Sequence, residues 1–247
     1  MGLVMHSSDS EPPTLVIIPA YNEGPRLART LADTTRVVPA DAVVVIDDGS
    51  SDDTAAVARA AGVRVVSHPF NLGYGAALQT GYKYAQRQRA RWLVQLDADG
   101  QHDPADIPQL LAPLERGAAD LALGSRFIEP SGYAMGAARD TGRRLLQRLL
   151  AALGGPHITD PTSGYQAMSA RIVELYCREY FPADYPDADM LLLLHRFGFR
   201  IVEVPVRMAP SPRRSMHQGL AVVYYAYKMM LSLFRSASLR APGQPLT

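Results

Sequence analysis

Short apolar runs alternate with amphipathic segments through the first part of the chain. Four runs rich in branched side chains indicate strands, at residues 14–19, 42–46, 63–67 and 92–96, and the first and last of them read as buried. Between them lie segments with apolar residues one helical turn apart, from about Arg26, over 54–61 and over 76–89. This alternation predicts an α/β fold with a mostly parallel central sheet flanked by helices.

The pattern is less regular in the second part of the chain. It predicts helices over 107–114, 139–153 and 189–197, and strands over 121–124 and 200–206. Residues 14–217 suffice for one α/β domain, and residues 218–236 follow as an apolar helix. The polar residues 1–13 predict a disordered leader, and residues 237–247 predict a disordered tail.

Polar side chains gather in the loops that follow three of the predicted strands. These are Tyr21–Glu23 after the first strand, Asp47 and Asp48 after the second, and Asp97 and Asp99 after the fourth. The carboxyl ends of parallel strands meet at one edge of a sheet, where ligands bind. The sequence therefore predicts that these loops build a single site.

Asp97 and Asp99 stand one residue apart just past a buried strand, and Gln101 extends the polar cluster. Two neighbouring carboxylates suit a hard divalent metal ion with oxygen ligands. A solvated turn is the alternative, because Asp and Gly both favour turns. Asp47 also has an alternative role, as the N-cap of the helix that begins near Asp53.

Composition narrows the class of protein. The 247 residues carry a net charge of +1, so no global field points to nucleic acid as a partner. The single cysteine, Cys177, excludes an intrachain disulfide framework and indicates a reducing compartment such as the cytoplasm. No segment reaches the roughly 20 apolar residues of a membrane span, and residues 1–13 lack the apolar core of a signal peptide.

Several motifs occur in order along the chain. They are IPAYNE at 18–23, DDGS at 47–50, NLGYGAAL at 71–78, DADGQH at 97–102, GSR at 124–126, DPTSGY at 160–165 and VPV at 204–206. With these motifs the chain resembles the family 2 glycosyltransferases, which have a GT-A fold. More narrowly, it resembles dolichol-phosphate-mannose synthases and bacterial polyprenyl-phosphate glycosyltransferases.

The resemblance implies metal-dependent, inverting transfer of a sugar from a nucleotide-diphosphate sugar, either a UDP- or a GDP-sugar. It implies that Asp97, Asp99 and Gln101 hold Mg²⁺ or Mn²⁺ at the donor diphosphate. Asp160 and Asp99 are the implied catalytic residues. The implied donor-binding residues are Pro19, Tyr21, Glu23, Ile46, Asp48, Asp97, Ala98 and Arg126.

The resemblance also implies a polyprenyl phosphate as the acceptor, undecaprenyl or dolichyl phosphate. The candidate phosphate-binding residues are Arg139, Arg143, Arg213 and Arg214, because arginine binds phosphate with two parallel hydrogen bonds. The relatives have a serine four residues after the first arginine, and this chain has Arg143 there. A solvated basic face of an amphipathic helix is the alternative for Arg139 and Arg143.

The apolar segment over 220–234 predicts a helix at the end of the fold. At about 1.5 Å per residue it is too short for a comfortable membrane crossing. One expectation places it at a membrane interface, with the protein cytoplasmic and peripheral at the inner face of the plasma membrane, or beside a small membrane partner. Packing on the core or a homo-oligomer contact is the favoured alternative.

Other functions stay open at this point. A family 2 glycosyltransferase can instead act on a hydroxyl of a glycan, protein or small molecule, which requires a general base. A non-catalytic nucleotide-sugar-binding module would bind the donor without turnover. A nucleotidyltransferase would release pyrophosphate rather than a nucleoside diphosphate.

Overall fold

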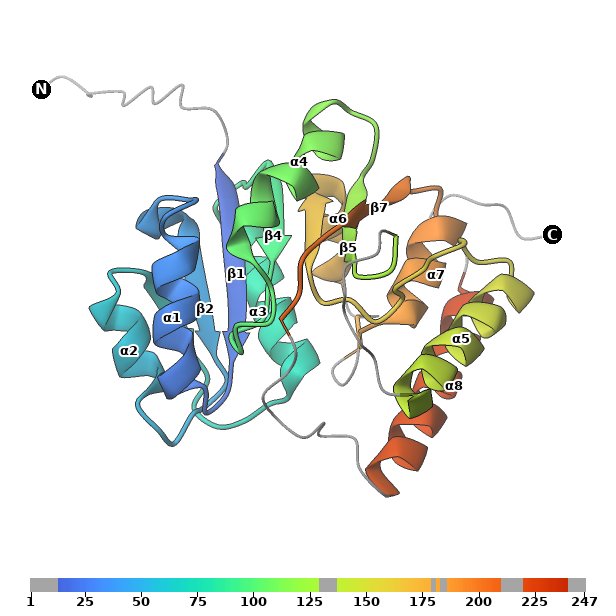
Figure 1. Cartoon of the computed structure of the whole chain (residues 1–247), viewed down its shortest axis with the longest axis horizontal. Coiled ribbons are helices and arrows are strands. Elements are labelled where there is room, and N and C mark those ends of the chain that lie inside the picture. Colours follow the sequence, from blue (N-terminus) through green and yellow to red (C-terminus); the bar gives the residue numbers. More distant parts are fainter. Residues whose placement is uncertain (1–12, 129–136, 179–180, 183–185, 210–219, 240–247) are drawn as a thin grey trace, which may run out of the picture.

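The computed structural model has a seven-stranded sheet with helices on both faces (Figure 1). It describes residues 13–128, 137–178, 181–182, 186–209 and 220–239, without the side chains of 137–139, 220–227 and 237. The strands are β1 Thr14–Ala20, β2 Val43–Asp47, β3 Arg64–Ser67, β4 Trp92–Gln95, β5 Leu121–Ser125, β6 Gln166–Ser169 and β7 Ile201–Pro205. The helices are α1 Gly24–Thr34, α2 Thr54–Ala60, α3 Tyr74–Arg87, α4 Ile107–Glu115, α5 Ala137–Ala152, α6 Ala170–Tyr176, α7 Ala188–Arg196 and α8 Leu220–Ser238, with short 3-10 turns at Ala40–Ala42 and Pro104–Asp106.

The strand order is β3-β2-β1-β4-β6-β5-β7. Strand β6 runs antiparallel to β4 and β5, and the other neighbouring pairs are parallel. The predicted α/β fold with a mostly parallel sheet is therefore confirmed. The carboxyl ends of β1, β2 and β4 lie at one edge, where an open α/β sheet binds its ligands.

Two apolar layers cover the sheet. On one face Leu78 of α3 and Leu191 of α7 pack against strand residues such as Ile17. On the other face Leu31 of α1 and Leu110 of α4 pack against strand residues such as Val16. Every residue of β2 is buried, as expected for a strand covered on both sides.

The sequence pattern did not predict β6 and α6, which follow directly after the 160–165 loop. Strand β6 has four residues and begins with the polar Gln166, so its apolar run is too short to stand out. Helix α6 follows without a side-chain cap, because the hydroxyl of Ser169 makes no capping hydrogen bond.

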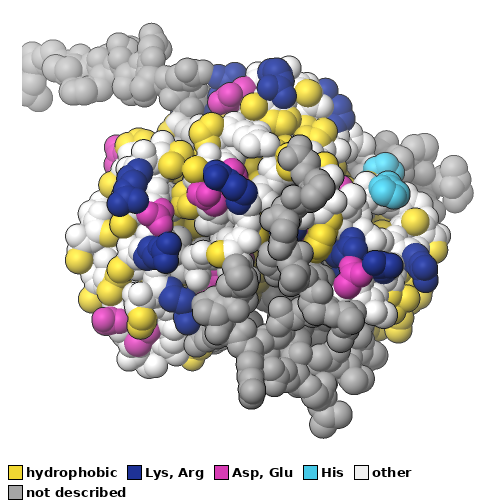
Figure 2. Space-filling view, viewed as in Figure 1, with side chains coloured by type: hydrophobic (Ala, Val, Ile, Leu, Met, Phe, Trp, Pro, Cys, Tyr) yellow, Lys and Arg dark blue, Asp and Glu magenta, His cyan; other side chains and the backbone are white. Residues whose placement is uncertain are grey.

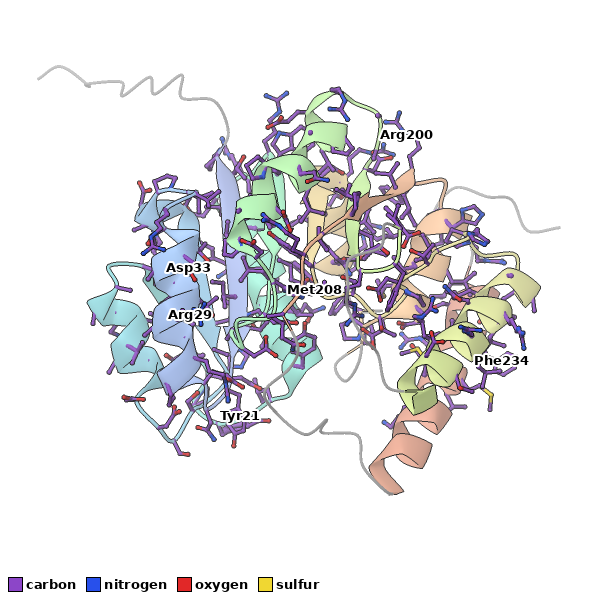
Figure 3. The ribbon with its side chains drawn as sticks, viewed as in Figure 1. Tyr21, Arg29, Asp33, Arg200, Met208 and Phe234 are labelled. Atoms are coloured by element: carbon purple, nitrogen blue, oxygen red, sulfur yellow. The ribbon has the colours of Figure 1, made fainter. Side chains whose placement is uncertain are left out.

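Helix α8 packs on the fold with one side. Met229 and Leu233 join a small apolar cluster with Leu192 of α7 and Leu150 of α5. The neighbouring side chains on the outer side remain exposed, at Met230, Leu231 and Phe234 (Figure 3). The helix ends at Ser238, two residues past its predicted end at residue 236. Within the described residues, the helices lack the length and apolar character of a membrane span.

Charged side chains of both signs are mixed on the molecular surface. On the face in Figure 2, Lys and Arg side chains lie near Asp and Glu side chains at several places. Ion pairs of the described residues include Arg29 with Asp33 at 3.7 Å on α1 and Arg207 with Asp103 at 3.1 Å. This mixture agrees with the small net charge of the chain.

Candidate active site

The turn Asp97–His102 follows β4 at the carboxyl edge of the sheet. The backbone N–H of Asp97 donates to Nδ1 of His102 over 3.0 Å. The hydroxyl of Tyr74, the first residue of α3, donates to Oδ1 of Asp97 over 2.9 Å. Asp99 accepts from both the backbone and the side-chain N–H of Gln101. Both carboxylates are thus held by neighbouring groups, which argues against a merely solvated turn.

His102 supports this turn from the interior. It is buried, and its ring stacks on Tyr165 with a centroid distance of 4.8 Å. Because Nδ1 accepts from Asp97, the neutral ring carries its hydrogen on Nε2, which lies 3.7 Å from Oδ2 of Asp97. Burial lowers the pKa of His102, in agreement with a neutral ring. The turn is also tied to α1, where Thr30 donates to the carbonyl of Ala98 over 3.0 Å.

Asp48 is buried just past β2 and connects two of the loops. Its carboxylate accepts the backbone N–H groups of Leu72 and Gly73, each over 2.9 Å. It also contacts Nδ1 of His68 at 2.7 Å. The loop that precedes α3 is therefore fixed against the end of β2, next to the turn that carries Asp97.

Asp47 closes its own loop, because its Oδ1 accepts the backbone N–H of Ser50 over 3.0 Å. The alternative role of Asp47 as a helix cap is not found. Asp52 accepts the backbone N–H of Thr54, the first residue of α2, over 3.0 Å instead. A short hydrogen bond from the Thr54 hydroxyl to Asp52 reinforces this contact.

The first loop lies at the same edge. Pro19 and Ile46 are buried register partners on β1 and β2. Tyr21 is exposed and lies at the lower edge of the molecule in Figure 3. Glu23 forms an ion pair with Arg26 at 2.5 Å, so its carboxylate is held at the first turn of α1.

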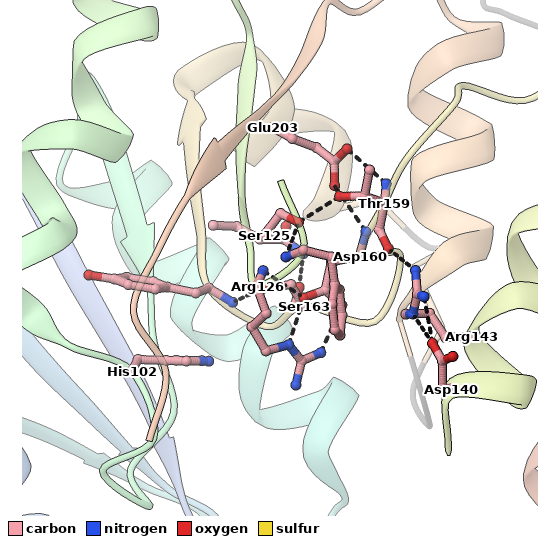
Figure 4. Close-up of polar contacts among 12 residues, drawn as sticks. His102, Ser125, Arg126, Asp140, Arg143, Thr159, Asp160, Ser163 and Glu203 are labelled. Carbon is pink, nitrogen blue, oxygen red and sulfur yellow. Dashed lines mark hydrogen bonds and ion pairs between the residues drawn. The ribbon is translucent and has the colours of Figure 1, made fainter. Parts of the chain in front are cut away.

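Arg126 and Asp160 form an ion pair with each other, whereas the sequence analysis assigned them separate roles. Nε and Nη2 of Arg126 each donate to a different oxygen of Asp160 over 2.7 Å (Figure 4). The Asp160 side chain is fully buried, and that of Arg126 is 12% exposed. Such a bidentate pair fixes the guanidinium plane and balances the charge of the carboxylate.

Glu203 on β7 supports this pair from behind, and the sequence did not point to it. Its carboxylate accepts the backbone N–H groups of Thr159 and Asp160 over 2.8 and 3.0 Å, and the Thr159 hydroxyl over 2.7 Å. Ser125, next to Arg126, contacts the same hydroxyl at 2.6 Å. The available signal was a single charged residue within the apolar segment IVEVP.

Arg143 contacts the same loop, at Thr159. It donates to Asp140 and, over 2.8 Å, to the carbonyl of Thr159, and it lies 4.3 Å from the ring centroid of Phe127. The neighbouring Arg144 is more exposed and pairs with Asp140 at 2.8 Å. A role of Arg143 in binding the acceptor phosphate stays a prediction.

The other acceptor candidates are not placed. Arg139 lies in α5, but its side chain is outside the described residues, as are Arg213 and Arg214 altogether.

The oxygen ligands at the sheet edge fit a divalent metal ion. Asp97 and Asp99 offer carboxylates, the ligands that Mg²⁺ and Mn²⁺ prefer. Gly164 keeps space beside them, since a Cβ there would lie 3.1 Å from Oδ2 of Asp97. Among the described residues, no three His, Cys, Asp or Glu side chains form a complete metal-binding group.

Comparisons with known proteins identify the family of this chain. Residues 15–176 match the model of glycosyl transferase family 2. An undecaprenyl-phosphate mannosyltransferase of Micrococcus luteus is 35% identical over 207 residues, which cover 78% of this chain and 82% of that protein. A polyprenol monophosphomannose synthase of Mycolicibacterium smegmatis is 32% identical, with 78% of this chain and 76% of that protein covered.

Solved structures show the same fold. A glucosyl-3-phosphoglycerate synthase from Mycobacterium tuberculosis, crystallised with Mn²⁺, UDP-glucose and phosphoglyceric acid, superposes with a TM-score of 0.69. It is 23% identical, and the match covers 95% of this chain and 83% of that one. The family match over residues 15–176 and the two relatives show that this chain belongs to glycosyltransferase family 2 and is a glycosyltransferase.

Proposed function

We propose that this glycosyltransferase moves a sugar from a UDP- or GDP-sugar to a polyprenyl phosphate, with Mg²⁺ or Mn²⁺ and inversion at the anomeric carbon. The observation that carries the proposal is the bidentate, buried Arg126–Asp160 pair beside the Asp97 and Asp99 carboxylates. The names of two relatives above, which act with undecaprenyl phosphate or polyprenol, support the choice of acceptor.

The donor would occupy the carboxyl edge of β1, β2 and β4. Tyr21 and Glu23 on the first loop and Asp48 on the second would hold the base and ribose. The diphosphate would then lie beside Asp97 and Asp99, which are the proposed metal ligands. A bound divalent ion would stabilise the negative charge on the departing nucleoside diphosphate.

The state of Asp160 favours a phosphate acceptor over a hydroxyl acceptor. Both of its oxygens accept from Arg126, so its charge is balanced by the guanidinium. An alcohol needs a general base to remove its proton during attack. A phosphate monoester is already ionised near neutral pH and needs no such base. Nδ1 of the nearby His102 is likewise engaged, by the N–H of Asp97.

In the proposed reaction an oxygen of the acceptor phosphate attacks the anomeric carbon from the side opposite the leaving group. A new carbon–oxygen bond forms as the bond to the donor diphosphate breaks, and that electron pair leaves with the nucleoside diphosphate. Arg126, oriented by Asp160, would lie close to these phosphates as a fixed positive charge.

Turnover with defined substrates tests the proposal. The full chain is mixed with UDP-glucose, GDP-mannose or UDP-N-acetylglucosamine, a short polyprenyl phosphate and Mn²⁺, and the nucleotide products are separated. We expect one donor to release its nucleoside diphosphate only when lipid phosphate and metal are both present, and EDTA to stop the release. Release of pyrophosphate, or binding of donor without any turnover, would contradict the proposal.

A further inference from the structure

His68 joins three elements around the candidate donor site. It follows β3, and its backbone N–H donates to the carbonyl of Asp47 over 2.8 Å. Its side chain is 9% exposed. Ring atom Nδ1 lies 2.7 Å from Oδ1 of Asp48, and Nε2 lies 2.9 Å from Oγ1 of Thr80 in α3. The imidazole therefore bridges the end of β2 and helix α3.

The hydrogen bonds around His68 identify the ring nitrogen that donates to Asp48. The carboxylate of Asp48 is an acceptor, so Nδ1 of His68 carries the hydrogen of this contact. The hydroxyl of Thr80 lies 3.0 Å from the carbonyl of Ala76 and 2.9 Å from Nε2 of His68. Thr80 therefore holds the other side of the ring.

The contact between His68 and Asp48 supports the loop that places α3. Asp48 accepts the backbone N–H groups of Leu72 and Gly73, which precede the first turn of α3. Gly73 has a φ of 99°, a backbone angle that glycine adopts without strain, so the loop can follow this path. The next residue, Tyr74, donates its hydroxyl hydrogen to Asp97. A short series of contacts thus leads from His68 to a proposed metal ligand.

We propose that His68 is a positioning residue for the donor: its Nδ1–H orients Asp48 toward the nucleotide, and the pair holds the loop that places Tyr74 against Asp97. This inference rests on the proposed donor pocket. Oδ1 of Asp48 is directed to His68 and Leu72, whereas Oδ2 accepts from Gly73 alone in the described contacts. One acceptor position on Oδ2 is therefore available for an N–H or O–H of the nucleoside.

Calorimetric titration of the full chain with UDP and with GDP, each with Mn²⁺, tests this role. For the nucleotide that the unaltered chain binds, we expect His68→Ala to raise Kd about tenfold or more, because a charge-assisted hydrogen bond is lost. His68→Asn should restore part of the affinity, because its side-chain N–H can replace Nδ1. His195→Ala, at an exposed position near the end of α7, should leave Kd unchanged.

A double-mutant cycle with Asp48→Asn separates the possible outcomes. We expect the effects of His68→Ala and Asp48→Asn on Kd to be clearly less than additive, because both remove the same pair. Additive effects, or a normal Kd in folded His68→Ala, would overturn the role of His68. A normal Kd in folded Asp48→Asn would overturn the donor pocket itself, and with it this inference.

Nitrogen NMR of the histidine rings provides a test without substitution at the site. In the unaltered chain at neutral pH, we expect Nδ1 of His68 to carry hydrogen. The signals are assigned by comparison with His68→Asn. A His68 ring with hydrogen on Nε2 alone would overturn the inference even where His68→Ala does not fold.

Discussion

The Arg126–Asp160 pair sets the charge balance of the candidate active site. Asp160 is fully buried and meets the guanidinium with both oxygens. Glu203 adds two backbone contacts and one hydroxyl contact to the adjacent loop. Because a buried charge is costly without its partner, we expect the loss of either side chain to affect both folding and turnover.

Asp160→Asn should therefore destabilise the fold strongly. The substitution leaves Arg126 nearly buried without its counter-charge, and we expect a loss of about 3 kcal/mol in the free energy of unfolding. The urea midpoint measures the change. Asp33→Asn is the matched control, since Asp33 pairs with Arg29 and Arg36 at the surface (Figure 3) and such pairs contribute about 0–1 kcal/mol. Equal midpoints for both variants would refute the burial argument.

Asp99→Ala should abolish sugar transfer while the fold stays intact. The carboxylate is a proposed metal ligand at the surface of a turn, so its loss removes stabilisation of the leaving diphosphate. We expect kcat/KM to fall at least about 100-fold, with an unchanged circular dichroism spectrum. Near-normal turnover in this variant would remove Asp99 from the metal site.

At the residue scale, the sequence predicted where the candidate side chains lie. It did not predict which of them pair with one another. Asp97, Asp99 and Asp48 lie at the sheet edge as their place after buried strands predicted. Arg126 and Asp160 are 34 residues apart, so no helical or strand period links them. His68 and Glu203 became visible only through their contacts, because an isolated His or Glu has no spacing to identify it.

Single elements position the site residues. Strand β7 brings Glu203 to the loop at Thr159, and α3 brings Tyr74 to Asp97. Helix α7 carries a buried carboxylate, Asp189, which accepts a short hydrogen bond from Ser232 of α8. The packing of α8 therefore has a polar component besides Met229 and Leu233.

Glu203→Gln should impair turnover more than donor binding. The amide keeps one acceptor oxygen, but its N–H₂ group replaces the other and so faces the backbone N–H of either Thr159 or Asp160. The loop that holds Asp160 should shift, so we expect a severalfold lower kcat with a nearly unchanged Kd for the nucleotide. Glu115→Gln, at the exposed end of α4, is the control. A raised Kd with normal kcat would assign Glu203 to the donor pocket instead.

Asp189 should make stability depend on pH. Burial raises its pKa above the ordinary 3.8. The folded state then holds a proton more readily than the unfolded chain, so the free energy of unfolding falls as pH rises from 3.8 through the raised value. We expect Asp189→Asn to raise the melting temperature more at neutral pH than at about pH 4. An equal shift at both pH values would show that Asp189 does not titrate in this range.

At the element scale, strong periodicity decided which segments were predictable. The first four strands and their helices stood out because short runs rich in branched side chains alternate with amphipathic segments. Strand β6 did not, since its sequence QAMS has no branched apolar run, and helix α6 follows it directly. The antiparallel position of β6 between β4 and β5 depends on pairing that no local pattern encodes.

The whole molecule has two parts that bear on function. One is the sheet edge proposed for the donor, and the other is the group of helices α5, α7 and α8 beside the β5–β7 end of the sheet (Figure 1). The family motifs and the GT-A fold were predictable from sequence, because each motif follows a strand end. The strand order and the ion pair across the site come from tertiary packing. The exposed side of α8 remains a candidate for an oligomer or membrane contact.

The acceptor is the central claim, and one competition reaction tests it most directly. The enzyme, its active donor and Mn²⁺ are incubated with equal amounts of a short polyprenyl phosphate and 3-phosphoglycerate, and the products are identified by mass spectrometry. We expect the sugar on the lipid phosphate, and no product in the Asp99→Ala reaction. A sugar on the hydroxyl of 3-phosphoglycerate, with the lipid unchanged, would contradict the proposed acceptor.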